Sequence, residues 1–462
     1  MLRRKIAIGL TAVCITAIVV SGCGGSKDDN LSKSDGVSEG FETESTSNEE
    51  EKLNNTDVKI LAQDSNVGNI VSTDEGMYRI VYEKLADNTW AQRIYYIDYA
   101  SAQEIVLCND SSCNHDTENC SGVIKDDNLI SPKLFVFQNK LYVFSSYDVS
   151  GSSDMVLEES DIYNVTTPSS CLYQMNLDGT NRKHILDFPD DISIDEMVFE
   201  WNGQLVFCKK EIKDMKSDDG QVQHIGVDRK LISLDPDTGE LTELTDFPQE
   251  LSVFGTYKNK LVCQRTIYPE GYTEEDTLEM ETDEWRELIG KSQAMYLLFD
   301  FETGKETEIC KLSGQEYFND CMVVEGKMYL ANGTPKVTCI DIESGQASEI
   351  TMPDNRSYSL VRNLGDRIYC WTEGQPAKTY FWDPKENEIS SADISMKGTD
   401  LANILAFNSE VIVVVREGNY KKSADGSYEI YSQTYGIMKK EELYKGNANC
   451  TLVSMCSDGM NK

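Results

Sequence analysis

Short apolar runs alternate with polar turns along most of the chain, and the clearest example is residues 171–186, CLYQMNLDGTNRKHIL. Two runs of apolar, aromatic and β-branched residues flank a turn of Asp, Gly and Asn, which is the local signal for two antiparallel strands joined tightly. The hairpin recurs, and its copies align on the residue before each turn: Asp98, Asn176, Asp235, Asp300, Asp341 and Asp383. These positions are 78, 59, 65, 41 and 42 residues apart. The last two spacings fall in the range of about 40 to 45 residues that is typical of a four-stranded propeller blade.

A second column of positions supports the repeat, because a short polar turn and an apolar triplet stand upstream of each hairpin. The triplets begin at Leu141, Leu205, Leu261, Met328, Ile368 and Val411, and Met77 with Tyr78 takes the same place before the first hairpin. Each unit therefore contains four strands joined by turn, loop and turn. The pattern predicts an all-β fold, a β-propeller of seven blades, with six and eight blades as the alternatives. Hairpins in an unrelated all-β fold are the competing interpretation.

Helical periodicity is found in one stretch, residues 273–291, which opens with Thr and Glu and presents Leu278, Trp285 and Leu288. We expect this stretch to be an insertion in one repeat unit. A two-lobed solute-binding protein would require repeated alternation of strands and helices, which the sequence lacks. A propeller must also pair its first and last blades, and we expect the apolar residues 58–61 to join the last blade.

The N-terminus has the composition of a secretion signal. Residues 1–5 are cationic, residues 6–20 are apolar, and Val20, Ser21, Gly22 and Cys23 follow. This ending resembles the lipobox of bacterial lipoproteins, in which cleavage falls before the Cys and a lipid is attached to its thiol. We therefore expect a signal peptide at 1–22 and a lipid anchor at Cys23, which would place the protein on the extracytoplasmic face of the cell membrane. An uncleaved signal anchor is the alternative.

Composition separates a tether from the folded domain. Residues 24–57 carry ten acidic residues and three lysines and few large apolar residues, so 23–57 is expected to be a disordered, lipidated tether and 58–462 the propeller domain. The formal net charge of the chain is −36. Such a charge argues against nucleic acid as a partner and against direct contact between the domain and an anionic bilayer.

A cluster of thiols and an imidazole follows the first hairpin: Cys108, Cys113, His115 and Cys120, with the spacing C-x₄-C-x-H-x₄-C. Three thiols and one imidazole suit tetrahedral zinc, although Cys113 and His115 are two residues apart and would need a turn to face one ion. A disulfide within the loop, favoured by an oxidising exterior, and free thiols are the alternatives. The fold itself requires no cofactor, and on the first two interpretations the cluster fastens a linker and has no catalytic role.

A family resemblance rests on these features. The segment LYQMNLDGTNRKHIL resembles the strand-turn-strand repeat of TolB-like and YWTD-type β-propellers. The lipobox, the acidic tether and the C-x-H cluster together resemble lipoproteins of unknown function from Gram-positive anaerobes. The resemblance implies fold and anchoring but no activity, because propellers host many functions. The chain departs from the pattern in lacking the Tyr-Trp-Thr-Asp tetrad, and residues 401–446 lack the Asp turn.

The sequence motifs favour binding over catalysis. The chain has three histidines and lacks the H-E-x-x-H motif, so we expect that it is not an enzyme. In an up-and-down blade the second connection and the links between blades share one face. The long connections are of this kind, and they are residues 109–133, 145–170, 209–230, 264–294 and 417–426. We expect this face to bind a protein, peptide or glycan; a glycan-active or other enzyme and an envelope assembly factor are the alternatives.

Overall fold

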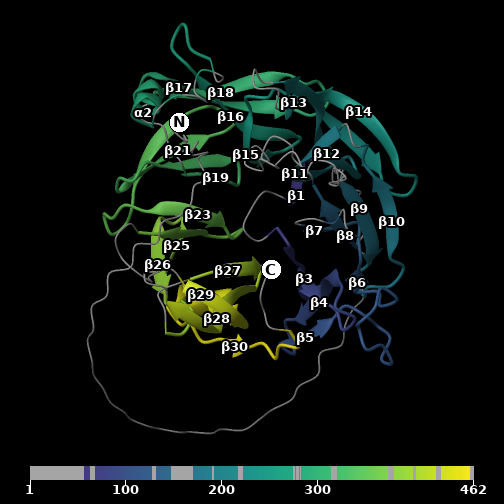
Figure 1. Ribbon diagram of the computed structural model, residues 1–462. Helices are drawn as coiled ribbons and strands as arrows, with labels where there is room; N and C mark the ends of the chain where they lie inside the picture. Colours follow the sequence, from purple (N-terminus) through teal and green to yellow (C-terminus); the bar gives the residue numbers. More distant parts are fainter. Residues whose placement is uncertain are drawn as a thin grey trace, which may run out of the picture. The chain divides into compact units, whose positions relative to one another are not determined.

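Seven antiparallel sheets follow one another along the chain as the blades of a β-propeller, and Figure 1 shows them in order around a ring. The chain divides into Met1–Asn55, which is outside the described residues, and Thr56–Lys462. The computed structural model describes residues 57–457 apart from 63–67, 127–128, 130–131, 147–169, 190–191, 217–221, 274–275, 277–279, 281, 314–319, 373–378, 399–401 and 423–427.

The first three blades differ in how many strands they contain. Blade 1 consists of β2 (Ile70–Ser72), β3 (Gly76–Lys84), β4 (Trp90–Asp98), β5 (Gln103–Val106) and the short β6 (Val123–Ile124). Blade 2 consists of β7 (Lys133–Phe137), β8 (Lys140–Ser145), β9 (Cys171–Asn176) and β10 (Lys183–Asp187). Blade 3 consists of β1 (Lys59–Ala62), β11 (Ile192–Trp201), β12 (Gln204–Lys216), β13 (Val222–Asp235) and β14 (Glu240–Asp246).

The remaining four blades have four strands each. Blade 4 consists of β15 (Ser252–Tyr257), β16 (Lys260–Ile267), β17 (Gln293–Asp300) and β18 (Glu306–Ser313), with the helix α2 (Thr282–Lys291) before β17. Blade 5 consists of β19 (Asp320–Val324), β20 (Lys327–Ala331), β21 (Lys336–Asp341) and β22 (Ala347–Thr351). Blade 6 consists of β23 (Ser359–Asn363), β24 (Ile368–Trp371), β25 (Thr379–Asp383) and β26 (Glu388–Ala392). Blade 7 consists of β27 (Ile404–Phe407), β28 (Val411–Lys422), β29 (Tyr428–Lys439) and β30 (Thr451–Leu452), with the helix α3 (Lys440–Tyr444) between the last two.

The seven-bladed prediction is confirmed, and in blades 1 to 6 the aligned Asp or Asn residue ends the strand that precedes the last tight turn. The local chemistry explains the column. The carboxylate of Asp341 accepts hydrogen bonds from the backbone N–H of Ser344 at 2.9 Å and from its hydroxyl at 2.7 Å. Gly345 then adopts a φ of +68° and donates its N–H to the carbonyl of Asp341. An acid followed by a residue in the left-handed region therefore reverses the chain into the fourth strand.

Each inner strand is buried on both faces because neighbouring blades pack against both sides of the sheet. In β8, Leu141 and Val143 pack against blade 1, whereas Tyr142 and Phe144 pack against blade 3. This arrangement accounts for the continuous apolar triplets of the sequence. Cys263 is fully buried in the same kind of position and packs as a small hydrophobic residue.

The predicted place of residues 58–61 is wrong. The strand β1 pairs with β11 on the inner edge of blade 3, and Lys59 forms an ion pair with Glu200 at 3.2 Å. Val58 is buried in the core that blades 3 and 4 share. The N-terminal strand therefore adds to a sheet in the middle of the chain and does not close the ring.

The ring closes through the end of the chain instead. Ser454 forms a parallel bridge to Gln103 in the outer strand of blade 1, with backbone hydrogen bonds to Ala102 and Glu104. Figure 1 shows this part of the chain beside β5. In blade 7, α3 replaces the tight turn of the other blades, which explains why residues 401–446 lack the Asp signal.

The two faces of the ring differ in their connections. The turn face carries the first and third connections of each blade, such as residues 73–75 and 99–102 in blade 1, whereas the loop face carries the second connection, such as residues 85–89, and the links between blades. Two of the predicted loops are extended hairpins: β12 pairs with β13 as far as Lys216, and β28 pairs with β29 as far as Lys422. Of the predicted helix, the structure describes α2, which buries Leu288 and leaves Trp285 exposed.

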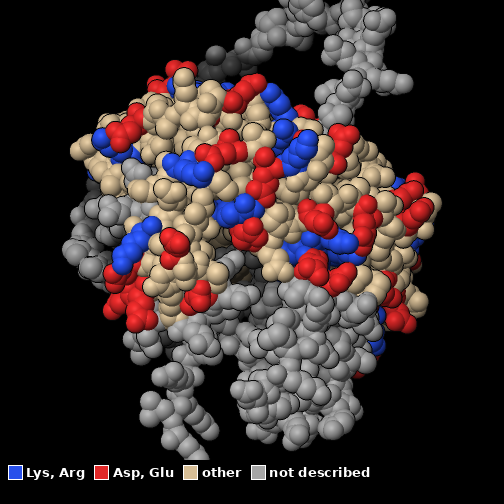
Figure 2. All heavy atoms as spheres, turned by 90° about the horizontal axis from the view of Figure 1, so that it is seen from above, with Lys and Arg blue, Asp and Glu red and all other residues tan. Residues whose placement is uncertain are grey.

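Ion pairs connect the outer strands of the blades to inner strands of the same sheets. Arg265 binds Glu306 at 2.7 Å, Lys230 binds Glu243 at 3.0 Å, and Lys336 binds Glu349 at 2.5 Å. Figure 2 shows acidic and basic side chains intermixed on the side of the molecule that lies at the top of Figure 1. Charged side chains on outer strands discourage pairing with other sheets.

Within the described part of the chain, neither helix is long and apolar enough to cross a membrane.

Candidate metal centre

The Cys/His cluster lies in a loop that interrupts the outer strand of blade 1. Leu107 donates its N–H to the carbonyl of Ile94 at 2.9 Å, and Ile94 donates its own N–H to Gly122 at 2.8 Å. The strand β6 then pairs with β4 beyond the point at which the pairing of β5 with β4 ends. The ends of the loop lie so close that a Cβ atom on Gly122 would come within 2.7 Å of the Leu107 carbonyl. The cluster follows the outer strand β5 and precedes blade 2, as predicted, but the return of the chain to β4 through β6 was not predicted.

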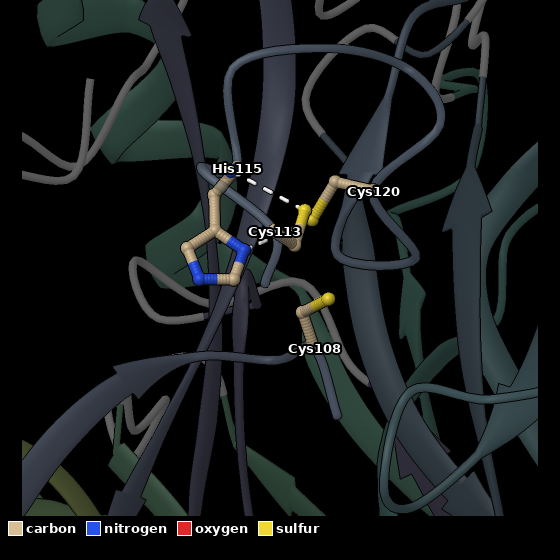
Figure 3. Close-up of side chains that lie close together, drawn as sticks. All are labelled: Cys108, Cys113, His115 and Cys120. Carbon is tan, nitrogen blue, oxygen red and sulfur yellow. Dashed lines mark hydrogen bonds between the residues drawn. The ribbon is translucent and has the colours of Figure 1, made fainter. Parts of the chain in front are cut away.

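The structure brings all four predicted ligands together. One ligand atom from each of Cys108, Cys113, His115 and Cys120 lies within 4.8 Å of the other three. Figure 3 shows the four side chains gathered around a common point, and Nδ1 of His115 lies 3.4 Å from Sγ of Cys120. The turn that the short spacing requires is present, because His115 has a φ of +60°. The arrangement can hold a metal ion.

Each of the three sulfur atoms accepts a backbone hydrogen bond from the residue two positions later. The N–H of His115 donates to Sγ of Cys113 at 3.3 Å. Asp110 donates in the same way to Cys108, and Gly122 donates to Cys120. Backbone N–H groups directed at sulfur stabilise a thiolate, which is the form that binds a metal.

The thiols at the two ends of the loop differ in their acidity. Burial alone would raise the pKa of Cys108, but hydrogen bonds from Asp110 and Ser121 outweigh it and hold that pKa below its usual value. At Cys120, burial dominates and raises the pKa to about 12. A metal ion would supply the positive charge that the buried thiolate of Cys120 needs, since a coordinating thiol is deprotonated.

The loop is held on both sides. Cys120 packs in a small apolar cluster with Leu85, Ala91 and Val123, and all four side chains are buried. On the blade 2 side, Arg182 donates from Nη1 to the carbonyls of Cys120 at 3.1 Å and Ser121 at 3.0 Å, and also to that of Val123. Its Nη2 donates to Glu118 at 3.1 Å. One guanidinium therefore binds four carbonyls of the loop and ties it to the next blade.

Among the described residues the structure contains no disulfide. The twelve cysteines that the structure describes all have free thiols, including the three in the cluster. The predicted anchor, Cys23, is outside the described residues. Arg182 was missed by the sequence analysis because nothing distinguishes it from other exposed residues of a hairpin.

Two cavities lie on the turn face rather than the loop face. The larger, of about 280 Å³, lies between blades 4 and 5, where Lys258 and Glu343 are 3.5 Å apart. The smaller, of about 150 Å³, lies between blades 5 and 6, where Lys385 and Glu325 are 2.7 Å apart. In both cavities the facing charges neutralise each other across the blade boundary. Each cavity lies at the boundary between two neighbouring blades, and its paired charges offer no unbalanced charge to a ligand.

The fold and the cluster define a seven-bladed β-propeller with a thiol-rich loop that can hold a metal. No family model and no curated protein matches the sequence. Three solved structures are similar. An oligogalacturonate lyase in complex with manganese has 12% identity and a TM-score of 0.39, and the match covers 77% of this chain and 85% of that one. Puromycin hydrolase has 10% identity and a TM-score of 0.44, with coverage of 85% of this chain and 57% of that one, and YjhT has 11% identity and a TM-score of 0.32, with coverage of 67% of this chain and 96% of that one. The match thus spans 57% of the length of puromycin hydrolase.

These comparisons correct one expectation. The prediction that the chain is not an enzyme is corrected, because a propeller fold does not exclude catalysis; two of the similar structures are a lyase and a hydrolase by name. The likeness, at 10 to 12% identity, shows the fold alone. No substrate, metal or activity of those proteins is transferred to this chain.

Proposed function

We propose that the chain is a lipid-anchored, extracytoplasmic β-propeller that binds a ligand on its loop face, and that zinc at the Cys/His cluster fastens its first blade. The binding role is supported by the difference between the two faces. The turn face is built from tight turns, such as residues 342–346 after β21, whereas the extended hairpin of β12 and β13 and the insertion that contains α2 belong to the loop face. Long connections on one rim are typical of functional loops.

Photo-crosslinking tests the binding role. A photoreactive residue at Ala86, exposed on the loop face of blade 1, is expected to trap an envelope molecule in native membranes. The matched control is the same residue at Glu302, exposed in a turn on the opposite face of blade 4, which should trap nothing. Crosslinks at Glu302 alone would place the binding surface on the turn face.

The anchoring role rests on the sequence Val20, Ser21, Gly22 and Cys23. Removal of the acceptor thiol in Cys23→Ala should shift the protein from the detergent phase to the aqueous phase in a phase-partition experiment. Cys14→Ala, in the preceding apolar run, is the matched control and should leave partitioning unchanged. Equal partitioning of both variants and the wild type would disprove lipid attachment at Cys23.

Zinc is the metal that the donor set fits, because thiolate and imidazole ligands in a group of four are typical of a structural zinc site. Four protein ligands leave no open coordination position, so the metal would serve the fold of the loop. Metal analysis of the full chain should find one zinc ion per chain, and Cys113→Ser and Cys120→Ser should lose it. Mass spectrometry of the unreduced protein distinguishes the competing state, since a disulfide would lower the mass by two hydrogens and leave no zinc.

A further inference from the structure

Two large aromatic side chains are exposed together on the loop face of blade 1. Tyr82 in β3 is 45% exposed and Trp90 in β4 is 49% exposed. Their rings stack with centroids 5.1 Å apart and an angle of 18° between the planes. Exposed aromatic residues that pack against each other and not against the core are a common feature of binding surfaces. We call Tyr82 and Trp90 the aromatic platform.

The platform stands on a rigid part of the fold. Tyr82 pairs with Gln92 and Lys84 pairs with Trp90 in the ladder between β3 and β4. The buried side chain of Gln92 donates to the carbonyl of Leu129 at 3.0 Å, which fixes this end of the sheet to the link that leads to blade 2. The connection between the strands is closed by a hydrogen bond from the N–H of Leu85 to the carbonyl of Thr89 at 2.8 Å. The platform is therefore formed before any ligand arrives.

The metal loop supports the platform from behind. Leu85 follows the end of the strand that carries Tyr82, and Ala91 is next to Trp90. Both side chains pack in one buried cluster with Cys120 and Val123. The same loop contains the candidate metal ligands, so its folded shape holds the base of the hairpin in place. Loss of the metal should loosen the hairpin that carries both aromatic rings.

The size of the platform indicates the kind of ligand. Tyr and Trp side chains each bury about 150 to 250 Å² when they are covered, so two half-exposed rings offer roughly 200 Å². A stable protein interface needs about 800 Å² on each partner. The neighbouring residues Lys84, Asp87 and Asn88 are exposed and polar, so the apolar area does not extend further around the turn. A sugar ring fits such a site, because its C–H face stacks on an aromatic ring and its hydroxyls bind the polar side chains around it.

The charges near the platform indicate a neutral ligand. Lys84 and Asp87 flank the platform. Hydrogen bonds from Thr89 hold the pKa of Asp87 below its usual value, and the nearby positive charge of Lys125 contributes to the same shift. Glu83, on the same hairpin, is paired with Arg93 at 2.9 Å, and Arg93 also faces Asp116 at 3.6 Å. Acidic and basic groups are thus mixed around the rings. The electrostatic potential around the rings therefore favours neither an anionic nor a cationic ligand.

From this geometry we infer that Tyr82 and Trp90 form a binding site for a neutral glycan, supported by the metal-binding loop. The inference rests on the proposed binding role of the loop face and names its ligand class. The rings stack on the sugar, and Lys84, Asp87 and Asn88 at the rim bind its hydroxyl groups.

Binding of defined oligosaccharides tests the inference. The full chain, solubilised in detergent, is incubated with an array of neutral oligosaccharides of hexoses, pentoses and N-acetylhexosamines, with uronate oligosaccharides and lysine-rich peptides as the other arms. The best neutral oligosaccharide is then titrated against variants. Trp90→Ala and Tyr82→Ala should each weaken binding by about tenfold or more, which corresponds to about 1.4 kcal/mol. Leu241→Ala is the matched control, because Leu241 is 36% exposed in β14, next to the turn face of blade 3, and should not affect binding.

Further variants separate the platform from the general fold. Trp90→Phe, which keeps a ring, should retain most of the affinity, and Cys113→Ser should weaken binding while the melting curve still shows a folded propeller. Unchanged binding by Trp90→Ala, or binding of uronates or peptides alone, would overturn the inference. If the photoreactive residue at Ala86 traps a ligand but no neutral oligosaccharide binds, the glycan assignment fails and the binding role survives. If neither experiment detects a ligand, both fail.

Discussion

The guanidinium of Arg79 and the carboxylate of Glu104 form an ion pair at 2.9 Å with both side chains fully buried, at the point where the end of the chain meets blade 1. The second oxygen of Glu104 accepts hydrogen bonds from the backbone N–H groups of Cys456 at 3.0 Å and Ser457 at 2.9 Å. Arg79 stacks over the ring of Tyr435 in blade 7 at 5.4 Å. The pair therefore connects the first blade, the last blade and the C-terminal segment, and closes the ring.

Removal of one charge of this pair should be costly. Glu104→Gln would leave the buried guanidinium of Arg79 without a counter-charge, so we expect the free energy of unfolding to fall by about 3 to 5 kcal/mol. Denaturant unfolding measures the change. Glu308→Gln, which breaks the exposed pair with Lys311, is the control and should cost about 1 kcal/mol or less. Equal, small effects of both variants would show that the buried pair does not close the ring.

The N-terminal strand β1 should contribute to stability although it does not join the last blade. Deletion of residues 57–62 removes the strand that covers the inner edge of blade 3 and exposes core that Val58 and Ala62 bury. We expect a clear fall in the melting temperature. Deletion of residues 26–51, in the predicted tether, is the matched control and should leave it unchanged; similar melting temperatures for both deletions would argue against a structural role for β1.

The aspartates that end a strand before a tight turn should make the free energy of unfolding depend on pH in the acid range. Hydrogen bonds from Ser344 hold the pKa of Asp341 below its usual value, and hydrogen bonds from Ser101 do the same for Asp98. A lowered pKa in the folded state adds stability above the unfolded pKa of about 3.9, and this stability is lost as pH falls through the folded pKa. The double variant Asp98→Asn and Asp341→Asn keeps the hydrogen-bond acceptors but does not titrate. Its melting temperature should therefore fall less steeply than that of the wild type below about pH 4; parallel curves would show that these acids do not contribute.

Arg182 should determine how firmly the loop holds its metal. Arg182→Met keeps the length of the side chain but removes the donors to four loop carbonyls. The loop then loses the hydrogen bonds that tie it to blade 2, so a competing chelator should remove zinc faster from this variant than from the wild type. Arg356→Met, at an exposed arginine in the link between blades 5 and 6, is the control. Identical rates of zinc release for all three proteins would refute a role for Arg182 in holding the loop.

The blades could be predicted from the sequence because each hairpin carries its own signal. An Asp such as Asp341 and the left-handed Gly345 four residues later determine the turn within a few residues of one another. The ring closure could not be predicted in this way. Ser457 binds Glu104 across 353 positions, and Lys59 binds Glu200 across 141, and no local pattern records either contact.

The candidate metal ligands could be named from the sequence, but their position in the fold could not. The four side chains stand out by chemical type. The strand that the loop interrupts resumes with only Val123 and Ile124, which is too short to give a strand pattern. The aromatic platform was missed for a similar reason, since Tyr82 and Trp90 continue apolar strands and only the structure shows that both rings are exposed.

The central claim is that Cys108, Cys113, His115 and Cys120 bind one zinc ion that fastens the outer strand of blade 1. X-ray absorption at the zinc edge of the purified full chain tests it most directly. We predict three sulfur neighbours at about 2.3 Å and one nitrogen neighbour at about 2.0 to 2.1 Å. In Cys113→Ser, the zinc should be lost. A zinc ion surrounded only by oxygen and nitrogen, or a folded chain that contains no zinc, would contradict the account.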